Sequence, residues 1–176
     1  MAFINAKDVQ AIRQELKVAF PAMKFSVRKQ HYSQVAVTLL QGDIAFNDLY
    51  RTDAYGKDNY VQINQFHTNM YGEHKAFCDN VLDIIKTAPA RGEGFHKGRG
   101  WFDESDSQSD YFHTAFYISF NIGAWDKPYL LTPEGQRKSL KIKLPKATKE
   151  VETLEQLVGA DMATKLRELG MIREIA

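Results

Sequence analysis

The sequence of 176 residues contains only one cysteine, Cys78. A single thiol excludes an internal disulfide, and such sparse use of cysteine fits a reducing compartment. Disulfides are not needed for stability, because a chain of this length buries roughly two-thirds of its unfolded surface on folding. We therefore expect an ordinary hydrophobic core to hold the fold without a structural metal.

Long apolar runs are also missing from the chain. No stretch approaches the roughly 20 residues that a membrane-spanning helix needs, and the first residues, MAFINAKDVQ, lack the basic start and apolar stretch of a signal peptide. The sequence thus predicts a cytoplasmic protein with no membrane partner. Its net charge of +1 neither favours nor excludes a nucleic-acid partner, because local patches decide that interaction.

The common catalytic motifs are absent as well. The sequence has no Gly-x-Ser-x-Gly elbow, no phosphate-binding loop and no dinucleotide fingerprint. Its histidines and its cysteine show no spacing typical of a zinc site. Cys78 falls on the apolar side of an expected helix, where a buried structural thiol is the favoured role. We expect no cofactor, no bound metal and no catalytic residue, and a non-enzymatic role is favoured over catalysis.

Apolar residues at steps of three and four predict two helices. In the first, at residues 4–21, Val9, Ile12 and Leu16 form one stripe, and Asn5 is the expected N-cap. The second covers residues 70–87, and Pro89 is expected to follow its end. Both stripes predict helices that pack against a core.

Period-two alternation predicts strands at residues 23–30 and 33–42, joined as a hairpin, and a short strand within residues 60–67. Residues 111–123 form the longest strand candidate, which we expect at the centre of the sheet. The expected fold is α+β: a mainly antiparallel sheet with helices packed on one face, plus a C-terminal helical extension. A shift in composition divides the chain into a domain at residues 1–135 and an extension at 136–176.

The acidic stretch FDESDSQSDYFH, at residues 102–113, has several readings. A calcium loop would need a glycine turn, a terminal glutamate and more oxygen ligands, all of which are missing. A solvated turn, in which Ser and Asp cap backbone groups, is the simplest reading. The stretch could also be a partner-binding lip, or a metal-dependent hydrolase site that includes His113. The candidate residues of the lip are Trp101, Asp103, Glu104, Asp106, Asp110 and Tyr111.

Two basic stretches are candidates for nucleic-acid binding. Basic residues that alternate with aromatic residues, as in the glycine-rich RGEGFHKGRGW at residues 91–101, can neutralise phosphates and stack on nucleobases. The second stretch, RKSLKIKLPKATK at residues 137–149, contains bases and no acid. The plain alternative for the first stretch is a flexible loop. For the second stretch it is a solvated segment in which every second residue packs inward. The candidate residues are Arg91, Lys97, Arg99, Arg137, Lys138, Lys141, Lys143 and Lys146.

Three segments together resemble a known family. They are LKVAFPAMKFSVRKQHYSQVAVTLLQG, YVQINQFHTNMYGEH and WFDESDSQSDYFHTAFYISFNIGAWDKPY. Residues 10–130 are similar to the twenty-ninth of the large polyvalent-protein-associated domains, which occur in proteins of phages, plasmids and conjugative elements. The family has no established catalytic residues. The resemblance implies a mobile-element accessory protein that acts in the cytoplasm of the host bacterial cell.

Three functional hypotheses follow from these observations. The first is a non-enzymatic anti-defence factor, of the anti-CRISPR or anti-restriction type, that binds a host protein or defence complex through the acidic lip. The second is a nucleic-acid-binding protein that uses the two basic stretches. The third is a metal-dependent hydrolase built on Asp103, Asp106, Asp110 and His113.

Overall fold

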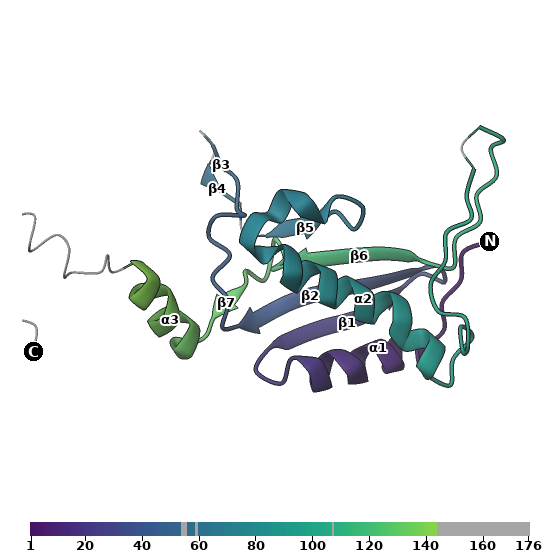
Figure 1. Cartoon of the computed structure of the whole chain (residues 1–176), viewed down its shortest axis with the longest axis horizontal. Coiled ribbons are helices and arrows are strands. Elements are labelled where there is room, and N and C mark those ends of the chain that lie inside the picture. The colour runs from purple at the N-terminus through teal and green to yellow at the C-terminus, as the bar shows by residue number, and fades with distance from the viewer. Residues whose placement is uncertain (54–55, 59, 107, 144–176) are drawn as a thin grey trace, which may run out of the picture. The chain divides into compact units, whose positions relative to one another are not determined.

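The computed structural model describes residues 1–53, 56–58, 60–106 and 108–143. The chain divides into one unit at Met1–Gln136 and another at Arg137–Ala176. The first unit is α+β, as predicted: two long helices, α1 and α2, lie along one face of a five-stranded sheet (Figure 1). The elements, in chain order, are α1 (Ala6–Ala19), β1 (Lys24–Gln30), β2 (Gln34–Gly42), β3 (Thr52–Asp53), β4 (Gly56–Lys57), β5 (Val61–Ile63), the 3₁₀ helix η1 (Thr68–His74), α2 (Lys75–Arg91), β6 (Tyr117–Ile122), β7 (Leu130–Leu131) and α3 (Pro133–Lys143).

The sheet is mixed, with strand order β1-β2-β6-β5 and with β7 paired to β2. The hairpin of β1 and β2 and the pair of β5 and β6 are antiparallel, whereas β2 runs parallel to both β6 and β7. The last long strand, β6, is therefore inserted between β2 and β5. Strands β3 and β4 form a separate two-stranded ribbon.

Helix α1 begins where the sequence predicts. The side chain of Asn5 accepts a hydrogen bond from the Asp8 N–H, and the Asp8 carboxylate accepts one from the Asn5 N–H, which forms a capping box. Val9, Ile12 and Leu16 face the core, so the predicted stripe is confirmed. The box satisfies backbone donors that a helix N-terminus otherwise leaves unpaired.

Helix α2 runs past the point where the sequence predicts its end. Pro89 lies inside the helix, which continues to Arg91. Proline removes one backbone donor, but this position is in the last turns, and the buried Ala88 and Pro89 hold the chain against the core. The N–H of Gly92 then reaches the carbonyls of Ala88 and Pro89 and closes the helix.

The core lies between the helices and the inner face of the sheet. Alternate residues of β1, β2 and β6 point into it, and cross-strand register places Val27 opposite Val37, and Val37 opposite Phe120. The longest predicted strand, at residues 111–123, is wrong in extent, because β6 begins at Tyr117. Residues before it leave the sheet and belong to a projecting arm.

Cys78 is fully buried in α2, as the sequence predicts. Burial, with a smaller contribution from the adjacent Asp79 carboxylate, raises the pKa of the thiol from 9.0 to about 11. The thiolate is the reactive form, so we expect alkylation at pH 8 to be at least about a hundredfold slower than in the urea-unfolded chain. Mass spectrometry after timed iodoacetamide treatment measures this ratio, and equal rates would contradict a buried thiol.

The same pKa shift has a consequence for stability. The folded state holds the Cys78 proton more tightly than the unfolded state does. This contribution is fully present below pH 9 and is lost as the pH rises through about 11.

Candidate partner-binding surface

Residues 101–106 and 108–115 form the two sides of a hairpin arm that projects beyond the end of the sheet (Figure 1). Its two sides are joined by backbone hydrogen bonds from Glu104 N–H to the His113 carbonyl, 2.8 Å, and from Asp106 N–H to the Tyr111 carbonyl, 2.7 Å. Near the base, Ala115 N–H donates to the Phe102 carbonyl over 2.9 Å. The acidic stretch is therefore the far part of this arm.

Trp101 anchors the base of the arm. Its indole Nε1–H donates to the Phe116 carbonyl over 2.8 Å, and its backbone N–H donates to the Lys86 carbonyl over 2.8 Å. The Lys86 ammonium lies 4.6 Å from the centre of the indole ring, a cation–π contact. Burial lowers the pKa of Lys86. Trp101 is half-buried in these contacts, so the geometry gives it a role in holding the arm.

Two of the predicted acids organise the turns of the arm. Asp103 accepts a hydrogen bond from the Ser105 N–H. Asp106 accepts one from the Gln108 N–H at 3.0 Å and one from the Ser109 hydroxyl at 2.8 Å, and these bonds lower its pKa. Both arrangements are Asx-type caps. The geometry favours the reading in which Ser and Asp cap backbone groups.

Glu104 joins the two sides of the arm. Its carboxylate accepts a hydrogen bond from Arg99 at 2.8 Å and lies 3.0 Å from Nδ1 of His113. The Arg99 guanidinium in turn lies 3.6 Å from the centre of the Phe102 ring, and this ring contacts His113 edge-on. Glu104 is therefore one member of a stacked cluster and does not stand as an unpaired charge.

The glycine-rich loop packs against the N-terminus of α1. His96 is buried, and its N–H donates to the Asp8 carboxylate over 3.1 Å. Its Nε2 lies 2.8 Å from the Phe3 carbonyl. These contacts, which join residues 88 and 93 positions apart in sequence, correct the expectation of a flexible loop.

The bases of the glycine-rich stretch are all paired with carboxylates. Arg91 makes a bidentate contact with Glu15 at 2.8 and 2.5 Å. Lys97 contacts Glu93 at 2.7 Å, and Arg99 contacts Glu104. Such pairing neutralises the charge that a phosphate backbone would need, so the geometry gives little support to nucleic-acid binding by this loop.

The second basic stretch begins in α3. Arg137 and Lys138 are exposed on this helix. Lys141 and Lys143 belong to the same helix, so the period-two packing predicted for residues 137–143 is wrong. Lys146 and the predicted C-terminal helices lie outside the described residues.

A pocket of about 410 Å³ lies beside the base of the arm. Phe95, 65% exposed, stands on its rim and packs edge-on against Phe3 with 5.0 Å between ring centres. Tyr111, 53% exposed, contacts the His113 ring from the arm. We call this pocket and these aromatics the aromatic surface. Its pocket is lined by Met1, Phe95, His96, Lys97, Arg99, Phe102, His113, Thr114 and Ala115.

Within the described ranges, one group of side chains has the spacing of a metal site, and it is not the predicted one. Ligand atoms of Asp48, Glu73 and His74 all lie within 4.8 Å of one another. The buried His74 already contacts Asp48 at 2.9 Å, which satisfies its ring nitrogen without an ion. The four residues of the hydrolase hypothesis are not gathered in this way, and no sequence spacing links position 48 to positions 73 and 74.

Comparison with known families finds a similarity over part of the chain. The family model described as large polyvalent protein associated domain 29 matches residues 4–87, which confirms the resemblance for both helices and the hairpin of β1 and β2. The arm and GAWDKPY lie beyond the matched range. No curated protein and no solved structure matches the chain. No helix within the described ranges is both long and apolar enough to cross a membrane.

Proposed function

We propose, from the match of residues 4–87 to the large polyvalent protein associated domain 29 family, that this phage-associated accessory domain acts by binding a host protein. The observation that carries the proposal is the aromatic surface. Interfaces draw most of their binding energy from a few aromatic and arginine side chains near a pocket. The aromatic surface presents that combination, with Phe95 and Arg99 from the glycine-rich loop beside the arm, and Trp101 anchors the base of the arm.

In this proposal the residues of the acidic lip mainly shape the arm and contribute less to partner binding. Asp103 and Asp106 shape the arm, and Glu104 holds Arg99 and His113 in place. Asp110, with a φ of 52°, sits at the exposed tip next to Tyr111. The partner would then be recognised chiefly by Phe95 and Tyr111, and the carboxylates would adjust orientation and association rate.

The finer proposal is that the host protein belongs to a defence system, such as a CRISPR or restriction complex. Phage plating efficiency, measured in host strains with and without each defence system, tests it. Expression of the chain should raise plating only where the defence is present. A chain that changes plating in none of these strains would remove the anti-defence proposal.

The surface itself is tested by a double variant, Phe95→Ala with Tyr111→Ala. Loss of two interface anchors should weaken partner binding by about 30-fold, equivalent to about 2 kcal/mol. A photo-crosslinker at position 111 should capture one distinct host protein, and the Phe95→Ala change should reduce that product.

The matched control is Tyr60→Ala with Phe66→Ala, which removes two exposed aromatics near β5. This pair should leave partner binding unchanged. Equal losses from both pairs, or the same crosslinked product from position 66, would show that the aromatic surface is not the binding site.

A further inference from the structure

The face of the sheet opposite α1 and α2 is uncovered in the part of the chain that the structure describes. Buried residues such as Val27, Val37 and Phe120 point to the helices, so their neighbours in each strand point outward. Apart from Leu40, these outward residues are polar or small, and they include no carboxylate. They are Ser26, Arg28 and Gln30 on β1, Gln34, Ala36, Thr38 and Leu40 on β2, Tyr117, Ser119 and Asn121 on β6, and Gln62 on β5.

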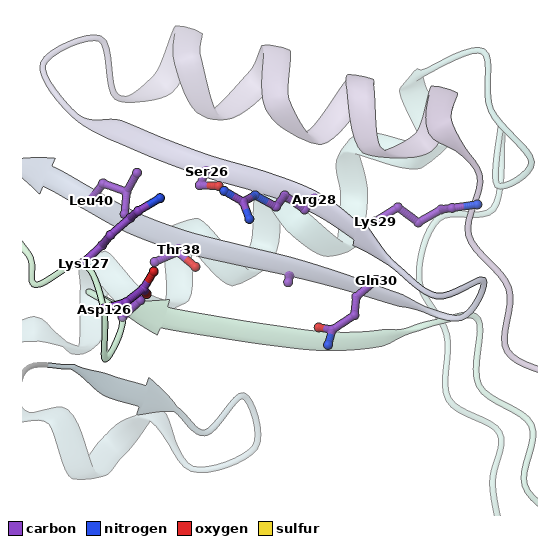
Figure 2. A pocket seen from close by; sticks show the side chains of 10 residues that line it. Ser26, Arg28, Lys29, Gln30, Thr38, Leu40, Asp126 and Lys127 are labelled. Atoms are coloured by element: carbon purple, nitrogen blue, oxygen red, sulfur yellow. The ribbon is translucent and has the colours of Figure 1, made fainter.

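A pocket of about 350 Å³ opens on this face (Figure 2). Arg28 enters it from β1, and Lys127 enters it from the turn that follows β6. In Figure 2 the ends of both side chains point toward Ser26, with Thr38 on the adjacent strand. Two basic side chains, Arg28 and Lys127, meet there against one acid, Asp126, whereas Lys29 also lines the pocket but extends away from them (Figure 2). The pocket is therefore positively charged and supplies hydroxyl groups that can donate hydrogen bonds.

The bases of this pocket differ from those of the glycine-rich loop. Among the described residues, Arg28, Lys29 and Lys127 have no carboxylate within ion-pair distance, whereas Arg91, Lys97 and Arg99 are each paired. A basic side chain without an ion-pair partner keeps its charge for an external anion, because no internal contact has to be broken first. The open face is thus the better placed surface for a polyanion.

Two exposed aromatic residues belong to segments that border this face. Trp125, 79% exposed, lies in the turn between the pocket residues Ala124 and Asp126. Tyr117, 53% exposed, begins β6. Exposed aromatic side chains beside a basic pocket suit the stacking of unpaired nucleobases. In a duplex, the faces of the nucleobases are stacked on one another and cannot reach these side chains. Outward amides and hydroxyls can also bond to base edges.

We propose that the open sheet face binds single-stranded nucleic acid, with phosphates at Arg28 and Lys127 and a base stacked on Trp125. This inference concerns other residues and another class of partner than the aromatic surface does. Asp126 is the single acid of the lining, and its negative charge would repel the phosphate. The two basic side chains come from segments about a hundred residues apart in sequence, so the site exists only in the folded chain.

Fluorescence anisotropy of the full chain with labelled single-stranded DNA and RNA of mixed sequence, over a range of salt concentrations, tests the proposal. Arg28→Gln with Lys127→Gln should weaken binding at least about tenfold. The slope of log affinity against log salt should fall by about 1.4, because each phosphate contact on a single strand contributes about 0.7. Trp125→Ala should weaken binding by about tenfold through lost stacking, and Asp126→Asn should tighten it.

The matched control is Lys7→Gln with Lys17→Gln, which removes the same charge from exposed positions on α1. It should change affinity by no more than about twofold. The proposal is overturned by no binding at low salt, or by equal losses from the sheet pair and the control pair. It is also overturned if Arg137→Gln with Lys138→Gln abolishes binding while the sheet pair does not, or if the matching duplex binds more tightly than either strand.

Discussion

Replacing Gly94 by alanine is expected to lower the free energy of unfolding by about 3 kcal/mol or more. A Cβ at this position would lie 1.9 Å from an Asp8 carboxylate oxygen and 2.7 Å from the Asp8 backbone nitrogen. Asp8 has no room to yield, because it is fully buried and accepts hydrogen bonds from the N–H groups of Asn5 and His96. The substitution therefore breaks the junction between α1 and the glycine-rich loop.

Gly98→Ala is the matched control for this prediction. Gly98 lies in the same loop with a φ of 79°, and a Cβ there would meet nothing within 4 Å. Only the cost of the left-handed conformation applies, about 1 to 2 kcal/mol. Urea unfolding followed by circular dichroism measures both variants. If Gly94→Ala proved no more destabilising than Gly98→Ala, the close contact with Asp8 would be wrong.

Replacing Phe46 by alanine is expected to lower the free energy of unfolding by about 3 to 5 kcal/mol. Phe46 is 1% exposed although it lies in a loop, and its ring contacts those of His74, Phe77 and Tyr129. Truncation leaves a cavity where the loop after β2, the start of α2 and the chain before β7 meet. Removing a buried ring of this kind loses both the free energy of its transfer from water and its van der Waals contacts.

Phe66→Ala serves as the control, because Phe66 is 64% exposed. This variant should stay within about 0.5 kcal/mol of the parent chain in the same urea titration. A Phe46→Ala variant as stable as Phe66→Ala would show that the loop after β2 does not belong to the core.

The periodic segments could be predicted because their energetics are local. The stripe of α1 and its cap at Asn5 arise from side chains within a few residues of one another. The hairpin of β1 and β2 follows from period-two alternation in two adjacent runs. The match to residues 4–87 covers these same elements, so the resemblance and the α+β class could be predicted from the sequence.

The candidate surfaces could be predicted only in part. The sequence identified Tyr111 and the acids of the arm, but it assigned residues 111–116 to a strand. An alternating pattern cannot tell a strand inside a sheet from one side of a projecting hairpin. Likewise, the alternation of β1 placed Arg28 outward, but nothing local linked it to Lys127.

Local patterns in the sequence predict α1, most of α2 and the β1–β2 hairpin, because each of these depends on contacts between near neighbours in the chain. Tertiary packing determines which charges remain available. It paired Arg91 with Glu15, placed Asp8 under the glycine-rich loop, and brought Arg28 and Lys127 into one pocket. The physical reason is that such pairings depend on strand order and packing, above all on the insertion of β6 between β2 and β5, and these place distant residues side by side.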